Sequence, residues 1–218
     1  VMPKTKEKKL EVVEVEKQEL AGNPKWEIAA TDIDIPRYNI RQKSSEYDAG
    51  EFGDLVIDKS RVVVKEGTMV DVIVVSAVKA WREKIDYQLG IRGRIARTEE
   101  ESIALTADSE YEVHPFADIT FLIPKPEGAD DDAYQFPIGD ETYAMGKLDV
   151  QNKSYRNTYM RLCTFAKFNP AVPLMKKTWT FKTEYDSRGK TEWYNATFTV
   201  AKGEAPDAVV EFVQNFTS

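Results

Sequence analysis

The sequence predicts a mainly β protein that ends in a short helix, and three observations support this class. Short runs rich in Val, Ile, Thr and aromatic residues alternate with turn residues along most of the chain. Two runs near the C-terminus alternate apolar and polar residues on either side of a turn at 186–190. The chain has no fixed-period repeat or low-complexity tract, which argues against a solenoid or a propeller.

The first half of the chain contains four candidate strands. Residues 33–43 alternate in polarity and predict the first strand, with Arg37 directed outward. Residues 55–57 and 61–64 flank a short turn and predict a hairpin. The run 69–78 is rich in β-branched residues, which favours a buried central strand, and it continues without a breaker to residue 87.

The second half predicts one further strand, two hairpins and the C-terminal helix. Residues 119–123 form a strand, and 134–150 form a hairpin. The clearest hairpin joins 178–185 to 191–200, and two of its rings, Trp179 and Phe181, share one face and are expected in the core. Pro206 and Asp207 open a helix whose apolar positions are Val209, Val210, Val213 and Phe216.

The 218 residues, of which 42% are hydrophobic, are enough for one substantial core. We expect a flexible charged arm at 1–24 and a single β-rich domain at 25–218 with an acidic insertion at 98–152. No apolar stretch reaches the roughly 18 residues that span a bilayer, and the first residues lack an apolar leader. The sequence therefore predicts a soluble, cytoplasmic protein without membrane contact.

The inventory of reactive residues argues against an enzyme. His114 and Cys163 are each the only residue of their type, and Cys163 is expected in the core. The acidic residues at 130–132 and 140–141 do not match the spacing of an EF-hand. No nucleotide-binding, hydrolase or metalloprotease motif is present. We expect no catalytic residue, metal or cofactor, with a nuclease built on carboxylates alone as a minor alternative.

Charge is segregated along the chain despite a net charge of −7. Residues 98–152 hold 14 acidic and 2 basic residues, whereas 153–190 hold 9 basic and 2 acidic residues, and 79–97 are also basic. The basic segments contain interleaved aromatic residues. Single-stranded nucleic acid offers both phosphates and base faces, so this mixture favours a single strand over a duplex. The same alternation is also typical of an ordinary β core.

Two blocks resemble a known family. Residues 35–45, Ile-Pro-Arg-Tyr-Asn-Ile-Arg-Gln-Lys-Ser-Ser, followed by Gly53-Asp54, resemble the opening motif of phage proteins encoded among replication genes, and the hairpin at 176–200 is similar to their penultimate segment. The two blocks cover about a quarter of the chain. Unlike many relatives, this chain has no cysteine-rich central insertion, and it lacks the acidic tail by which bacterial single-strand binders recruit partners.

The resemblance implies an OB-like barrel with hairpin insertions that binds single-stranded DNA without sequence preference in replication or recombination. The setting would be the cytoplasm of an infected bacterial host, with replication or recombination proteins as further partners and with self-association allowed. The expected contacts are Arg37, Arg41, Lys43, Arg82, Lys84, Arg92 and Arg94 for phosphates, Trp81, Tyr87, Tyr155 and Tyr159 for bases, and Arg156 and Arg161 beside them. The alternative is a structural or interaction protein, such as a virion component or a host-factor inhibitor, without nucleic-acid affinity.

Overall fold

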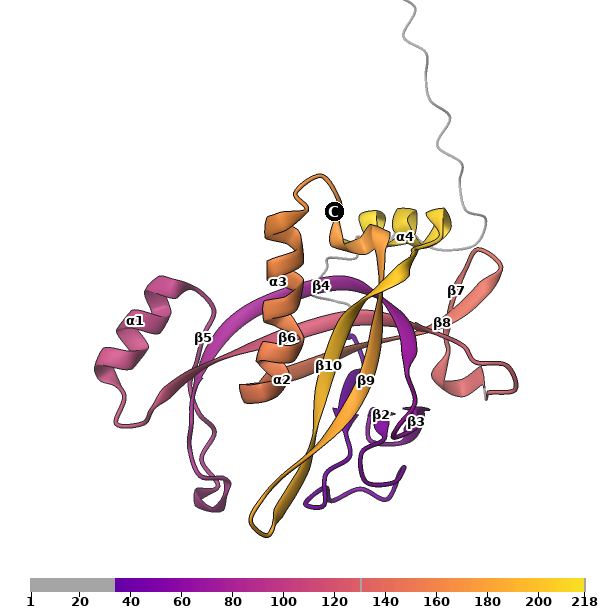
Figure 1. Ribbon diagram of the computed structural model, residues 1–218. Coiled ribbons are helices and arrows are strands. Elements are labelled where there is room, and N and C mark those ends of the chain that lie inside the picture. The colour runs from indigo at the N-terminus through magenta and orange to yellow at the C-terminus, as the bar shows by residue number, and fades with distance from the viewer. Residues whose placement is uncertain (1–33, 130, 218) are drawn as a thin grey trace, which may run out of the picture. The chain divides into compact units, whose positions relative to one another are not determined.

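The computed structural model describes residues 34–129 and 131–217. The chain divides into two units, Val1–Asp34 and Ile35–Ser218, and the second carries the strands and helices labelled in Figure 1. The expected N-terminal arm at 1–24 and the start of the domain at residue 25 lie outside the described residues.

The elements follow one another along the whole second unit (Figure 1). The strands are β1 (Arg37–Ile40), β2 (Leu55–Ile57), β3 (Arg61–Val64), β4 (Val70–Glu83), β5 (Ile95–Ala96), β6 (Val113–Pro124), β7 (Phe136–Ile138), β8 (Glu141–Gln151), β9 (Lys177–Arg188) and β10 (Thr191–Glu204). The helices are α1 (Glu99–Asp108), α2 (Asn152–Asn157), α3 (Tyr159–Phe168) and α4 (Asp207–Thr217), with short 3-10 turns η2 (Tyr87–Leu89), η3 (Asp131–Ala133) and η4 (Leu174–Lys176).

The described strands form one curled sheet. Its order is β10-β9-β4-β6-β8-β1-β2-β3, with β5 beside β4 and β7 beside β8. Neighbours along this path are antiparallel except β1 and β8, which are parallel. The sheet bends into a half-barrel (Figure 1). The mainly β class expected from the sequence is confirmed.

The barrel core has Greek-key topology. Strands β4, β6 and β8 are consecutive neighbours, and the chain then returns through α2 and α3 so that β9 lies on the other side of β4. The resulting order, β9-β4-β6-β8, is that of a Greek key. Strand β10 adds the fifth strand. Because an OB fold is a five-stranded, partly open Greek-key barrel, this core is OB-like.

Strand β4 connects the two halves of the barrel. Its first residues, Val70–Ile73, pair with β9, and the stretch from Ile73 to Glu83 pairs with β6. A register shift between Val74 and Ser76 marks a bulge. Bulges bend a strand and increase its twist, so this one helps the sheet to curl from β9 toward β8.

Apolar clusters cover both faces of the sheet. The larger cluster centres on Phe121, whose ring centroid lies 5.6 Å from that of Phe181 and 5.4 Å from that of Phe198. Trp179 belongs to the same cluster and contacts Phe165 of α3. Trp179 and Phe181 are fully buried, which confirms that these two rings are core.

The second cluster lies beneath α4. Val209, Val210 and Val213 are buried there, in the same cluster as Ile73 and Leu122 of the sheet. The expected C-terminal helix is therefore confirmed, together with its apolar face. Its amphipathic spacing explains the packing, because a surface helix is stabilised mainly by burying one face.

Three expected hairpins are confirmed as β2–β3, β7–β8 and β9–β10. The sequence does not predict α2 and α3, whose aromatic residues it assigns to ligand contacts. Helix α3 buries Leu162 against the larger cluster. Cys163, expected in the core, is exposed on the same helix.

The segment 98–152 is not an insertion onto the barrel, because it supplies the central strands β6 and β8. Its acidic residues lie mostly outside these strands. Glu101 completes a capping box with Thr98 at the start of α1, where negative charge is favourable. Asp131 pairs with Lys125 in the loop that follows β6. A count of charges along the chain therefore could not separate the acidic surface loops of this segment from the apolar core strands between them.

Gly146 of β8 provides the first test of this packing. A Cβ atom there would lie 2.7–2.8 Å from ring atoms of Tyr38, which is buried. Gly146→Ala should lower the free energy of unfolding by about 1–3 kcal/mol, the usual cost of overpacking a core. When Tyr38 is replaced by Leu, the Tyr38 ring is gone, so Gly146→Ala should lower the free energy of unfolding by clearly less. Urea denaturation of the four proteins in this double-mutant cycle measures the coupling, and purely additive effects would contradict the proposed contact.

Candidate functional site

A groove of about 1010 Å³ lies where the half-barrel does not close, between β1 and β10. One wall is formed by β1, the loop after it and the start of α2. The other wall is the tip of the β9–β10 hairpin, and the end of β8 lies between them. The groove therefore borders strands that are far apart in the sequence.

A glutamine side chain joins the two walls. Gln42 donates from Nε2 to the carbonyl oxygen of Tyr194, and its Oε1 accepts from the backbone N–H of the same residue, each at 3.0 Å. The carboxamide thus supplies both hydrogen bonds that a neighbouring strand would give to Tyr194. It closes the barrel at one point and leaves the groove beside it open.

Other side chains pair with the same edge of β10. Ser154 Oγ accepts from the N–H of Ala196 at 3.0 Å, and Arg161 Nη1 donates to the carbonyl oxygen of Phe198 at 2.8 Å. An exposed strand edge is a template for unwanted pairing with another chain. These contacts cap the edge, so the role of Arg161 in the fold is to satisfy a β10 carbonyl.

The two sequence blocks that carry the family resemblance meet at this seam. Gly53 has a φ of +100°, and a Cβ there would lie 2.7 Å from the Tyr194 ring. Asp54 is buried and accepts hydrogen bonds from the N–H groups of Glu51 and Glu66. The Gly-Asp pair of the first block therefore shapes the loop on which Tyr194 of the second block rests.

Two ion pairs cross the groove. Lys43, after β1, pairs with Glu192 of β10, and Lys153 of α2 pairs with Asp186 of β9 at 2.8 Å. The lysine partners lower the pKa of both carboxyl groups below their ordinary values. Both carboxylates therefore stay charged at neutral pH.

Four further cations line the groove, namely Arg37, Lys147, Arg156 and Lys190. Within the described ranges, none of them forms an ion pair shorter than 4.0 Å. Arg37 and Lys147 are direct partners in the parallel β1–β8 pair. Like charges placed opposite each other destabilise a sheet. A bound anion between them would remove this repulsion.

Aromatic rings also line the groove. Trp193 is half-buried and has no ring or hydrogen-bond partner for its side chain within the described residues. Tyr194, by contrast, is held edge-on against Phe52 at 4.8 Å and donates from its hydroxyl to Glu66. The Arg41 guanidinium lies over Tyr47, 5.8 Å from the ring centroid. Trp193 is thus the ring that the fold leaves available.

The groove brings together three of the residues expected from the sequence, Arg37, Lys43 and Arg156. Sequence reasoning did not select Lys147, Lys153, Lys190 and Trp193. Lys153, Lys190 and Trp193 lie in or next to the basic segment 153–190, which was a usable signal. Lys147 was hidden because it is one of two cations in the acidic segment.

Three other expected residues near the groove have contacts within the fold. Arg41 donates to the carbonyl oxygen of Ala49 at 3.0 Å and braces the loop after β1. Tyr155 and Tyr159 stack on each other with centroids 5.1 Å apart and pack on the larger apolar cluster. Burial and the Cys163 thiol raise the pKa of Tyr159 to about 12. These two rings therefore pack within the fold and are not assigned to base stacking.

The remaining expected residues belong to an arm formed by the ends of β4 and β6, together with β5, η2 and α1. Arg82 pairs with Asp149 and lies 3.8 Å above the Phe116 ring centroid. Lys79 lies over Trp81 at 4.4 Å. Lys84 and Arg92 are both exposed on the surface of the arm, and the side chain of Tyr87 lies outside the described part.

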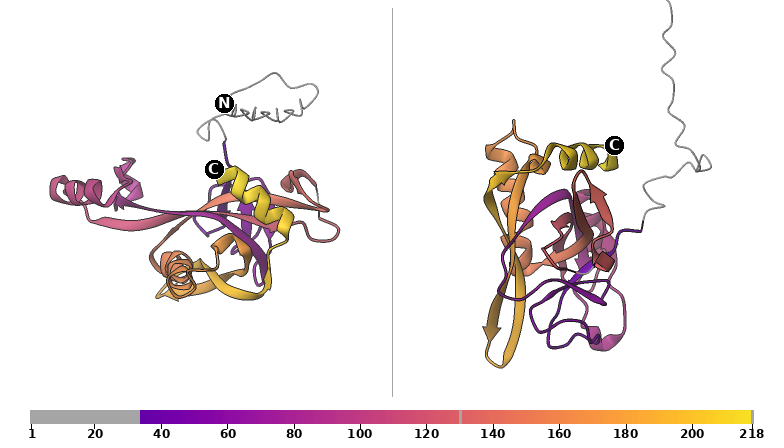
Figure 2. Two further views of the ribbon diagram at one scale, coloured as in Figure 1. Left: turned by 90° about the horizontal axis from the view of Figure 1, so that it is seen from above. Right: turned by 90° about the vertical axis from the view of Figure 1, so that its right-hand side faces the viewer.

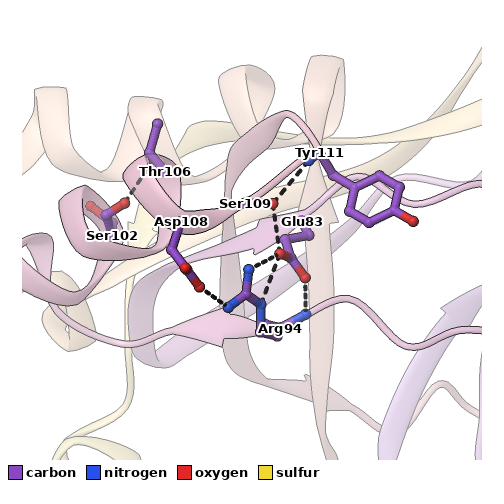
Figure 3. Close-up of polar contacts among 7 residues, drawn as sticks. All are labelled: Glu83, Arg94, Ser102, Thr106, Asp108, Ser109 and Tyr111. Atoms are coloured by element: carbon purple, nitrogen blue, oxygen red, sulfur yellow. Dashed lines mark hydrogen bonds and ion pairs between the residues drawn. The ribbon is translucent and has the colours of Figure 1, made fainter.

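Arg94 belongs to a network at the base of this arm (Figure 3). Glu83, the last residue of β4, is buried and accepts from Arg94 Nε at 2.9 Å and from Ser109 Oγ at 2.6 Å. Arg94 also donates to Asp108 at 2.6 Å. These contacts, chiefly the hydrogen bond from Arg94, lower the pKa of Glu83 to about 2. The guanidinium fastens α1 to the sheet.

A metal-binding cluster and a membrane-spanning helix are both absent from the described residues. In these ranges no group of three or more His, Cys, Asp and Glu side chains is placed to hold a metal ion. None of the helices in the same ranges combines the length and the apolar character that crossing a bilayer requires.

No protein-family model, curated protein or solved structure matches the chain. The charges, rings and strand positions of the groove are therefore the basis for assigning a function.

The Glu83 network predicts a specific dependence of stability on pH. The folded pKa of about 2 lies below the ordinary value of 4.5, so the stabilisation is complete above that ordinary value and is lost as pH falls toward 2. Glu83→Gln should therefore lower the melting temperature most at neutral pH, and the gap to the unaltered protein should shrink steadily between pH 4.5 and 2. Thermal unfolding followed by circular dichroism measures both curves. A gap that stays constant over this range would contradict the ionised network.

Proposed function

We propose that the protein binds single-stranded DNA in the groove between β1 and the β9–β10 hairpin, without sequence preference and without catalysing a reaction. The observation that carries this proposal is the pair Arg37 and Lys147, two adjacent cations without an ion pair in the described ranges, at the edge of a groove that also holds Trp193. Phosphates and bases need these two kinds of group.

The position of the groove in the fold supports the same ligand. OB folds bind oligonucleotides on the face of their second and third strands and at the loops that join strands one to two and four to five. Here β8 is the third strand of the Greek key, and the β9–β10 turn is the loop between the fourth and fifth. Both border the groove.

A single strand fits this arrangement better than a duplex. The cations lie on both walls of the groove, and Trp193 lies among them. A ring in such a position can stack on an unpaired base, whereas a duplex hides its base faces. Because backbone contacts and stacking do not discriminate bases, binding without sequence preference follows.

The family resemblance supports a role in protecting single strands during replication or recombination. The cytoplasm of an infected bacterial host would then be the site of action, and replication or recombination proteins would be further partners. The contact set favoured by the groove is Arg37, Lys43, Lys147, Lys153, Arg156, Lys190 and Trp193.

Intrinsic fluorescence tests the base contact. An oligo(dT) strand added at low salt should quench tryptophan emission, because a stacked base quenches the indole. Trp193→Phe should remove most of this quenching, whereas Trp81→Phe, on the arm, should keep it. Trp193→Ala should also weaken binding by about 1–3 kcal/mol. If quenching persisted in Trp193→Phe and disappeared in Trp81→Phe, the base would stack on Trp81 of the arm and the assignment of Trp193 would be wrong.

Salt dependence tests the phosphate contacts. The double variant Arg37→Gln with Lys147→Gln should bind oligo(dT) more weakly, and its logarithmic salt slope should be shallower by about 0.7 for each phosphate that is no longer neutralised. Lys202→Gln removes one exposed cation of β10 that does not line the groove; as a control for loss of positive charge elsewhere, it should change neither the affinity nor the slope. Fluorescence anisotropy at several salt concentrations measures the slopes. Equal slopes for the double variant and the unaltered protein would refute the assignment.

Protein–protein contact is a second candidate function, favoured by exposed apolar side chains on the arm. Leu89, Ile91, Ile95 and Ile103 are each about half exposed or more. Such residues are frequent in interaction surfaces. Size-exclusion chromatography with labelled oligonucleotide separates the two candidates, because a pure interaction protein would assemble without retaining the label.

A further inference from the structure

The tip of the β9–β10 hairpin carries two carboxylates on the basic groove. Glu192 pairs with Lys43 and Asp186 pairs with Lys153, so two of the six groove cations named above are already neutralised by the opposite wall. A carboxylate offers a lysine the same kind of charged oxygen acceptor as a phosphate does.

The side chains of both lysines remain partly exposed to solvent beside their partners. The side chains of Lys43 and Lys153 are 61% and 42% exposed, whereas those of Glu192 and Asp186 are 33% and 28% exposed. Ion pairs with this degree of exposure are weak, because water screens them. An incoming anion can therefore reach the ammonium groups.

The carboxylates keep other partners when a lysine leaves. The Tyr185 hydroxyl donates to Glu192 at 2.5 Å. Asp186 accepts from the N–H of Ser187 at 2.9 Å and from Asn195 Nδ2 at 3.3 Å. The two lysines can therefore exchange partners without leaving a carboxylate uncompensated.

The hairpin does not depend on these ion pairs for its position. The β9–β10 ladder runs from Lys177 to Glu204, and Gln42 holds Tyr194 from the facing wall. Because the tip is fixed by backbone hydrogen bonds, the charged pairs are available for another role.

We propose that Asp186 and Glu192 occupy the phosphate positions of Lys153 and Lys43 in the free protein, and that a bound strand displaces them. This autoinhibitory contact rests on the proposed function. It lowers the affinity of the groove below what six free cations would give. It also disfavours weak anions, which must compete with a carboxylate that is already in place.

Neutral variants of the two acids test the competition. Asp186→Asn and Glu192→Gln keep the size and polarity of each side chain and release one lysine each. Each should bind oligo(dT) more tightly at low salt, by up to about fivefold, which is the upper range for an exposed ion pair. The salt slope should steepen by about 0.7 for each released lysine.

The matched control is Glu211→Gln, an exposed acid on α4 that does not line the groove. It makes the same change in net charge and should leave affinity and slope nearly unchanged. The proposal would be overturned if Asp186→Asn and Glu192→Gln bound oligo(dT) no more tightly than this control does.

Lysine acetylation followed by mass spectrometry separates this inference from the proposed function. Oligo(dT) should protect Lys43 and Lys153 together with Lys147 and Lys190 in the unaltered protein. Protection of Lys147 and Lys190 without Lys43 and Lys153 would overturn the displacement and leave the proposed function intact. The absence of protection at all four would instead refute the proposed function.

Discussion

The half-barrel depends on one bent strand. Because β4 pairs with β9 at its start and with β6 over the rest of its length, the hydrogen-bonded ladders of the two halves are continuous through this strand. The bulge at Val74 lets it turn between them. Apolar clusters then form on both faces of the sheet, one around Phe121 and the other beneath α4.

The curl brings β1 and β10 close together without pairing them. This leaves backbone groups of β10 that need partners, since an unpaired polar group at a partly buried edge costs free energy. Gln42, Ser154 and Arg161 provide those partners from three separate segments. The groove is the space that remains beside these point contacts (Figure 2 shows the half-barrel from two further sides).

Electrostatics in the groove divides the cations into two sets. Lys43 and Lys153 form ion pairs with carboxylates, whereas Arg37 and Lys147 stand side by side and form no ion pair within 4.0 Å among the described residues. The first set links the two walls through weak, exchangeable ion pairs that do not fix the position of the hairpin, and the second set adds positive charge to the groove. A polyanion would be attracted by the second set and then compete for the first.

Periodicity alone determined most of the strands, the three hairpins, the core positions of Trp179 and Phe181 and the C-terminal helix, because each depends on the local alternation of apolar residues. The sequence also pointed to Arg37, Lys43 and Arg156, three of the residues that line the groove. Tertiary structure decided the rest. Whether Arg82, Arg94 and Arg161 are free depends on acids and carbonyls that lie 11 to 67 residues away, and Lys147 joins Arg37 only through a parallel strand pair. The order of residues in the sequence does not specify such long-range pairings. Only the curled sheet therefore decides which cations are bound within the fold and which remain free to contact a ligand.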